Sequence, residues 1–408
     1  MAGQGFRERG TTRRRALALA AAAGLLLAGG GCAEPPPDTT ARDIQQVLDG
    51  RAAAVLGHDE AGFVAALDGK LRAAGRTEFA NLADVPLRSW EYRLTGVRRE
   101  GDRARADAQL RYRLDGYDSA PVTMDRTLEL SERDGRWYVV ADRARGGAQQ
   151  LWQQGDVEVV RGSHSLVLGV GQDKERLRRI AADADRAVPA VSAAWPGRWA
   201  GRVVVLVPGS LEAMGRLLGS PAAGYRGIAA VTTGETRGSG SAPADRVIVN
   251  PEAYGMLGDF GRRVVLTHET THVATRAQTS PATPMWLSEG FADWVAYRAT
   301  GRTAAEAAPE LRRAVRAGDL PSRLPADDAF RFGTDAEALG RAYEGGWLAC
   351  RLIAERWGTE ALAGLYRAVG TSARREDALE RALHEVLGTN LEAFTADWRE
   401  YVSARLGG

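Results

Sequence analysis

Two histidines and a glutamate occur at a spacing that could hold a metal ion. Residues 266–272 read Leu-Thr-His-Glu-Thr-Thr-His, so His268 and His272 are four residues apart. On an α-helix these side chains would lie one turn apart on the same face, where two imidazoles can bind one Zn²⁺ and Glu269 stands beside the metal. A catalytic zinc has three protein ligands and one open position for water. The stretch therefore predicts a third ligand, a His, Asp or Glu, on a following element.

A second predicted helix supplies a candidate for that ligand. Thr283 and Pro284 are typical of an N-cap and a first helical residue, and the helix would continue over about residues 285–300. Glu289 would lie in its second turn. Asp293, four residues later, would share that face and could accept a hydrogen bond from a ligand histidine, with a solvated helix aspartate as the alternative.

The two segments together resemble the glutamate-zincin metallopeptidases, and especially their aminopeptidase-like branch. The second helix of that branch commonly reads W-L-x-E-G-[FL]-A, and residues 286–292 read Trp-Leu-Ser-Glu-Gly-Phe-Ala. The resemblance implies that His268, His272 and Glu289 bind one Zn²⁺ per chain. Glu269 would act as the general base, taking a proton from water and later delivering it to the leaving amine. A surface helix with two histidines is the alternative for the first segment alone.

A third segment extends the resemblance. Residues 342–348 read Ala-Tyr-Glu-Gly-Gly-Trp-Leu, which is similar to the Y-E-K-G segment of the same branch. In that family the tyrosine hydroxyl stabilises the oxyanion, which implies this role for Tyr343. Gly345 stands where the family often has lysine, so the match is partial. A core tyrosine at a helix start is the alternative.

One segment of that family has no counterpart here. Aminopeptidases of the branch carry a G-x-M-E-N segment that grips the free amine of the substrate, and Leu211–Gly215 does not match it. The sequence therefore predicts a zinc endopeptidase that cleaves a peptide or protein substrate internally. Two alternatives remain open, namely an aminopeptidase with a different amine anchor and a non-hydrolytic, zinc-containing binding lipoprotein. A closed fourth coordination position would favour the binding protein.

The predicted fold class is α+β, with two domains. Residues 39–150 predict helices followed by antiparallel strands with hairpin turns at Gly101-Asp102 and Asp134-Gly135, an arrangement that resembles the SnoaL-like, cystatin-type cone superfamily. We assign this domain a spacer or interaction role. The predicted strands cover residues 89–99, 103–113, 122–131 and 137–141.

Residues 156–408 predict a zincin domain with a mixed-sheet upper half and an all-helical lower half. In the resembled family an edge strand pairs with extended substrate, and Ile228–Val231 is the candidate here. A Gly/Ser-rich loop over residues 234–244 follows it. Asp259 is the predicted N-cap of the helix that carries His268, and the irregular connection over residues 321–332 is expected to line the cleft. The predicted lower-half helices cover residues 304–317, 336–357, 360–369, 376–387 and 391–406.

The N-terminus predicts export and lipid anchoring of a bacterial protein. Residues 1–31 combine an arginine-rich start with a short apolar run, as signal peptides do, and loosely resemble a twin-arginine signal. The run ends Leu-Ala-Gly-Gly-Gly-Cys, which resembles a lipobox, so Cys32 is the predicted lipid attachment site, with simple secretion as the alternative. Residues 32–38 form a proline-rich tether. The mature chain would lie at the outer face of the cytoplasmic membrane.

Composition limits the partners of the chain. The 408 residues are 44% hydrophobic and 26% charged, with a net charge of +2. The first 31 residues carry five Arg and one Glu, so their removal would leave a net charge of −2. Nothing in this balance favours nucleic acid. Cys32 and Cys350 are the two cysteines, and Cys350 is expected to be a small buried side chain.

Overall fold

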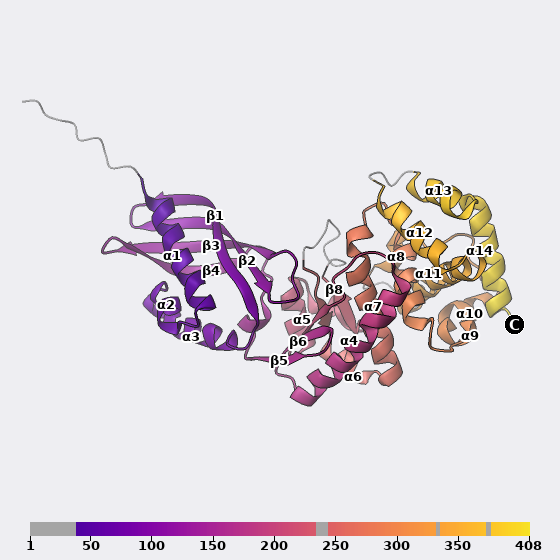
Figure 1. The fold of residues 1–408 in the computed structure, drawn as a ribbon, viewed down its shortest axis with the longest axis horizontal. Helices are drawn as coiled ribbons and strands as arrows, with labels where there is room; N and C mark the ends of the chain where they lie inside the picture. Colours follow the sequence, from indigo (N-terminus) through magenta and orange to yellow (C-terminus); the bar gives the residue numbers. More distant parts are fainter. Residues whose placement is uncertain (1–37, 234–243, 332–334, 373–376) are drawn as a thin grey trace, which may run out of the picture. The chain divides into compact units, whose positions relative to one another are not determined.

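A computed structural model of the chain describes residues 38–233, 244–331, 335–372 and 377–408 (Figure 1). The predicted signal peptide, most of the tether, Cys32 and most of the Gly/Ser-rich loop lie outside these residues. Within them, no helix combines the length and the apolar character that crossing a membrane requires. The described chain has two sheets and a helical C-terminal part, so the predicted α+β class is confirmed.

The N-terminal part is a four-stranded antiparallel sheet with three helices. Its strands follow one another in the order β1-β2-β3-β4, and alternating buried and exposed residues along β2 leave one face for the core. Asp134 and Gly135 both have positive φ, at 52° and 72°, as a tight two-residue hairpin turn requires. The elements are α1 Thr40–Leu56, α2 Glu60–Ala65, α3 Arg72–Asn81, β1 Leu87–Glu100, β2 Arg103–Leu114, β3 Val122–Arg133 and β4 Arg136–Ala144.

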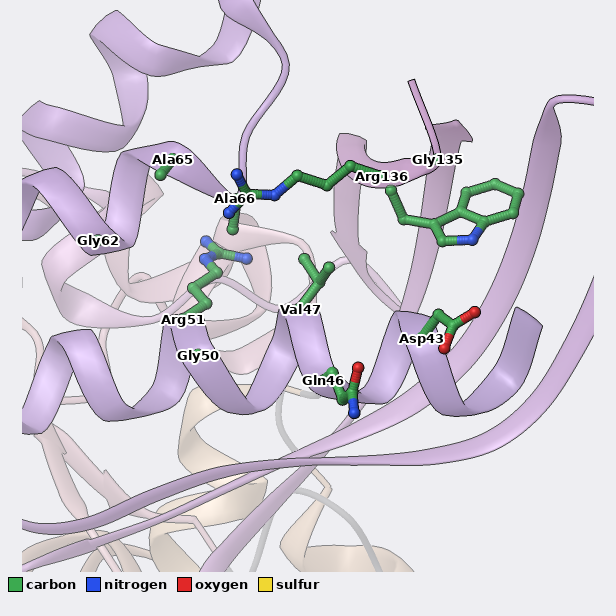
Figure 2. A pocket seen from close by; sticks show the side chains of 11 residues that line it. Asp43, Gln46, Val47, Gly50, Arg51, Gly62, Ala65, Ala66, Gly135 and Arg136 are labelled. Carbon is green, nitrogen blue, oxygen red and sulfur yellow. The ribbon is translucent and has the colours of Figure 1, made fainter. Parts of the chain in front are cut away.

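Aromatic side chains fill the buried face of this sheet. The ring of Trp152, from the connection after β4, lies 5.5 Å from that of Trp90 and 5.1 Å from that of Tyr112. A cavity of about 580 Å³ lies elsewhere, between α1, α2 and the start of β4, where Arg51 and Arg136 contribute to the lining (Figure 2). Arg51 donates a hydrogen bond to Asp142 at 2.9 Å, which ties its charge into the core. The spacer or interaction role of this domain stays a prediction.

The second sheet is mixed and supports the zinc-motif helix. Its order is β5-β6-β7-β9-β8, with β6, β7 and β9 parallel and both edge strands antiparallel to their neighbours. Valine and leucine runs buried along β6 and β7 are typical of strands covered on both faces. The candidate edge strand does lie at an edge, as β8, although Ile228 and Ala229 precede it. The elements are β5 Val157–Arg161, β6 Ser165–Val170, α4 Lys174–Ala194, β7 Val203–Val207, α5 Leu211–Leu218, β8 Ala230–Thr232, β9 Val247–Val249 and α6 Pro251–Met256.

The remaining elements of the described residues are helices. The helix predicted over residues 304–317 is wrong as one element, because Pro309 begins a new helix and cannot donate to the turn before it. The helix predicted over residues 376–387 is α13 followed by a π-helical turn over Leu383–Leu387. The elements are α7 Asp259–Thr275, α8 Met285–Tyr297, α9 Ala304–Ala307, α10 Pro309–Arg316, α11 Ala336–Arg356, α12 Thr359–Gly370, α13 Ala378–Ala382 and α14 Leu391–Leu406.

Two predicted helix caps are also wrong. Gly258 is the N-cap of α7, and Asp259 is its first helical residue. Pro284 is the N-cap of α8, in place of the predicted Thr283, and α8 ends at Tyr297, earlier than predicted. Gly258 and Pro284 have the extended backbone of N-cap residues, and the residue after each is already helical. Both helices still carry the predicted zinc-motif residues.

Candidate metal centre

Helix α7 presents His268, Glu269 and His272 from its buried part. Three threonine hydroxyls of this helix donate hydrogen bonds within it. Thr267, Thr271 and Thr275 each donate to the carbonyl four residues earlier, at 2.8, 2.8 and 3.0 Å. These bonds allow a polar segment to pack in the interior. In that interior, the imidazoles of His268 and His272 face the carboxylate of Glu289.

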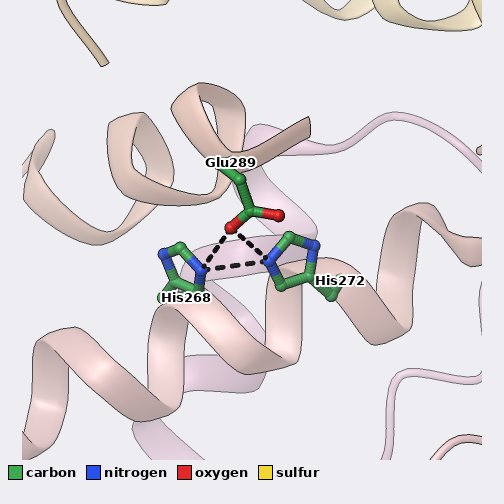
Figure 3. Close-up of side chains that lie close together, drawn as sticks. All are labelled: His268, His272 and Glu289. Atoms are coloured by element: carbon green, nitrogen blue, oxygen red, sulfur yellow. Dashed lines mark hydrogen bonds and ion pairs between the residues drawn. The ribbon is translucent and has the colours of Figure 1, made fainter. Parts of the chain in front are cut away.

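The two histidines and Glu289 converge on one point (Figure 3). Nε2 of His268 lies 3.0 Å from Nε2 of His272. Oε2 of Glu289, on α8, lies 3.2 Å from the first nitrogen and 3.4 Å from the second. All three ligand atoms lie within 4.8 Å of one another, and Glu289 is 2% exposed. This group could bind a metal ion.

The chemistry of the group fits a cation. Oε2 of Glu289 is buried and accepts no hydrogen bond from any residue that the structure describes, although it faces two imidazoles. Burial disfavours a charged His268, yet Asp293 and Glu289 outweigh it and hold the pKa of His268 well above its usual range. Burial also opposes the charge of Glu289, but His272 and His268 hold the pKa of its carboxyl below the usual range. The site therefore stabilises positive charge, and two imidazoles with one carboxylate match a catalytic zinc set.

Asp293 lies against one of the two candidate histidine ligands. Its Oδ1 lies 2.8 Å from Nδ1 of His268, one helical turn beyond Glu289. In the tautomer with a proton on Nδ1, the imidazole donates to this carboxylate and leaves its Nε2 lone pair free to bind a metal. The structure thus places Asp293 where the sequence predicts a carboxylate that orients a ligand.

Tyr343 reaches the centre because α8 and α11 pack very closely. A Cβ on Gly290 would lie 2.2 Å from the carbonyl oxygen of Gly346, so only glycine fits where the two backbones touch. The ring of Tyr343 lies 6.2 Å from that of His268 and 5.2 Å from that of Phe330. Tyr343 is in the third turn of α11 and not at the helix start, and its half-buried side chain packs against the core, so the alternative of a core tyrosine stays open. The contact between Phe330 and Tyr343 brings the connection after Pro321 close to the site at Phe330.

One residue of the centre, Thr232, could not be predicted from the sequence. The hydroxyl of Thr232, on β8, donates a hydrogen bond to Oε2 of Glu269 at 2.8 Å. Both side chains are buried, and Thr232 is fully so. A threonine in a short strand carries no spacing signal, and its position beside Glu269 depends on how the sheet packs against α7. The sequence offers no local pattern that would find it.

The chain is similar to several solved protein structures. No family model and no curated protein matches the chain. A two-domain M1 zinc metallopeptidase bound to L-arginine aligns over 76% of this chain and 62% of its own, with 16% identity and a TM-score of 0.34. An M1 zinc metallopeptidase from Deinococcus radiodurans, bound to a Tyr-Ser-Ala substrate, aligns over 74% and 61%, with 15% identity and a TM-score of 0.31. The chain thus spans less than two thirds of the length of either metallopeptidase.

A second group of structures matches a shorter part of the chain. A protein of unknown function from Mycobacterium tuberculosis covers 26% of this chain and 70% of its own, with 16% identity and a TM-score of 0.23. A SEC-C motif containing protein from Rhodopseudomonas palustris covers 26% and 90%, with 18% identity and a TM-score of 0.21. At these identities, residue roles must come from the geometry of the site itself.

Proposed function

We propose that this chain is a zinc-dependent peptidase that cleaves peptide bonds internally, acting at the outer face of a bacterial cytoplasmic membrane. The observation that carries the proposal is the convergence of His268, His272 and Glu289 in one buried cluster. Asp293 stands behind one ligand, and Glu269 lies beside the ligands on the same helix. A purely structural zinc site has no need of that additional carboxylate.

Each residue of the site has its own role in the proposed reaction. His268, His272 and Glu289 would hold Zn²⁺, which when bound would supply Lewis acidity that polarises a carbonyl and activates water. Glu269 is the general base that takes the proton of the attacking water and returns it to the leaving amine. The hydroxyl of Tyr343 donates a hydrogen bond to the developing oxyanion. Together these groups suit hydrolysis of an amide bond.

Internal cleavage is preferred for two reasons. The sequence has no G-x-M-E-N segment to grip a free amine, and the corresponding edge of the sheet is formed by Ala230–Thr232. This strand has apolar side chains at two of its three positions, with no carboxylate to bind an ammonium group. The strand thus supplies no ammonium-binding carboxylate of its own, which supports internal cleavage.

The location rests on the N-terminal sequence. Cys32 follows an apolar run and a set of small residues, which supports lipid attachment after removal of residues 1–31. Intact-mass analysis of the membrane fraction should then find a diacylglyceryl group on Cys32. An unmodified N-terminus would contradict anchoring, and would leave the peptidase proposal untouched.

The test of activity compares wild type with Glu269→Gln. A diverse peptide library is digested by each zinc-loaded protein, and the products are identified by mass spectrometry. Internal cuts made by the wild type alone are expected, while both proteins keep one zinc. Trimming from one end would replace the endopeptidase proposal with an aminopeptidase. Identical products from both proteins would contradict hydrolysis and favour a zinc-containing binding protein.

A further inference from the structure

The candidate general base is held by a residue outside the zinc motif. Thr232 Oγ1 lies 2.8 Å from Oε2 of Glu269 and 3.2 Å from its backbone oxygen. Thr232 is 0% exposed and Glu269 is 5% exposed, so this hydrogen bond lies in the interior. The hydroxyl therefore restrains one carboxylate oxygen of a side chain that has three rotatable bonds.

Hydrogen bonds join β8 to β9 beside Thr232. Thr232 pairs with Val247 on β9. Immediately beyond, the amide of Thr233 donates to the carbonyl of Arg246 at 2.9 Å, and the amide of Arg246 donates to the hydroxyl of Thr233 at 3.1 Å. These bonds hold Thr232 in register with β9.

Arg246 connects this hairpin to the N-terminal domain. Its guanidinium binds the carboxylate of Asp118 in bidentate fashion, at 2.8 and 2.7 Å. Asp118 lies between β2 and β3. The side chain of Arg246 is 6% exposed and that of Asp118 is 1% exposed. A bidentate pair removed from water fixes geometry strongly, because parting the two charges would leave both unpaired in the interior. The contacts thus run from Asp118 through Arg246 and β8 to Glu269.

We propose that Thr232 is a positioning residue for Glu269, and that the N-terminal domain supports the site by anchoring β8 through Asp118 and Arg246. The proposal rests on the proposed role of Glu269 as general base. A displacement of about 1 Å in a catalytic group can cost about 100-fold in rate, so one hydrogen bond that fixes a carboxylate has a large effect. The role also gives the N-terminal domain a function beyond that of a spacer.

The test uses Thr232→Val, which keeps the shape and removes the hydroxyl, and Thr232→Ser, which keeps the hydroxyl. In the zinc-loaded full chain, Thr232→Val should lower kcat about 10- to 100-fold with KM nearly unchanged, and Thr232→Ser should restore most of the rate. Thr40→Val is the matched control and should keep the wild-type rate, since this buried threonine at the start of α1 accepts a hydrogen bond from Arg99 outside the site. A wild-type kcat in Thr232→Val, or a serine variant as slow as the valine variant, would overturn the proposal.

A crystal structure of zinc-loaded Thr232→Val gives a readout that is independent of activity. The Glu269 carboxylate should leave its wild-type position or become disordered, while the three ligands stay in place. An unchanged Glu269 would overturn the positioning role whatever the kinetics show. If the wild type cleaves no peptide, the peptidase proposal fails, and this structural comparison still decides the role of Thr232.

Discussion

Asp293 and His268 lie on different helices, and their Oδ1 and Nδ1 atoms are 2.8 Å apart. Nε2 of the same imidazole lies 3.2 Å from Oε2 of Glu289. We expect Asp293→Asn to weaken zinc binding about 10- to 100-fold, as the loss of such supporting carboxylates does elsewhere. Competition with a chromophoric chelator measures the change. Asp259→Asn, an exposed carboxylate at the start of α7, is the control and should bind zinc as the wild type does.

Tyr343 lies beside His268, with their rings 6.2 Å apart. If its hydroxyl stabilises an oxyanion, Tyr343→Phe should lower kcat by about 100- to 1,000-fold and leave KM and zinc affinity nearly unchanged. Steady-state kinetics on a peptide cleaved by the wild type provide the measurement. Tyr401→Phe removes a hydroxyl that donates to Glu355 and should leave the rate unaltered. Full turnover by Tyr343→Phe would remove this residue from the mechanism.

The Asp118–Arg246 pair should matter for stability far more than a nearby surface pair. Asp118→Asn leaves a buried guanidinium without its counter-charge, so we expect the free energy of unfolding to fall by about 3–5 kcal/mol. Asp115→Asn breaks an exposed pair with Arg88 in the same region, and should cost less than about 1 kcal/mol. Urea denaturation compares them. Equal effects would contradict the structural role of Asp118.

Glu344 should make stability depend on pH. Its carboxylate accepts backbone hydrogen bonds from Glu310 and Leu311, at 3.1 and 2.5 Å, where α10 begins. Burial raises the pKa of Glu344 to about 7, although those two N–H groups act in the opposite direction. Because the unfolded pKa is about 4.3, the folded state binds more protons between about pH 4.3 and 7. This contribution to stability is complete below about pH 4.3 and is lost as the pH rises through 7.

The measurement for Glu344 is urea unfolding of metal-free protein from about pH 5 to about pH 8. The wild type should lose on the order of 1 kcal/mol of unfolding free energy across this range, a figure reduced for the partial exposure of the group. Glu344→Gln does not titrate and should lack that loss. Parallel pH profiles for the two proteins would show that Glu344 titrates at its ordinary pKa.

Zinc removal should lower the melting temperature. A ligand that binds only the folded state adds about 4 kcal/mol of stability when its free concentration is about 1,000 Kd. We therefore expect chelation to lower the melting temperature by several degrees, and added zinc to restore it. His272→Ala removes a ligand and should show no zinc-dependent shift, while Glu269→Gln should shift as the wild type does. A full shift in His272→Ala would place the zinc elsewhere.

Features that depend on neighbouring residues can be predicted from the sequence. The four-residue spacing of His268 and His272 places them on one helix face, and the same spacing relates Glu289 to Asp293. Alternating and continuous apolar runs predicted both sheets, because strands bury every second residue or every residue. These patterns are local, so they can be recognised without knowing how the chain packs.

Contacts between distant segments become visible only in the folded chain. Thr232 and Glu269 are 37 residues apart, and their contact exists because β8 lies at the sheet edge against α7. Asp118, in the connection between β2 and β3, and Arg246, immediately before β9, are 128 residues apart. Gly290 and Gly346 touch because two helices pack backbone to backbone. No spacing rule encodes such contacts, since they depend on strand order and helix packing, which are settled only when the whole core forms.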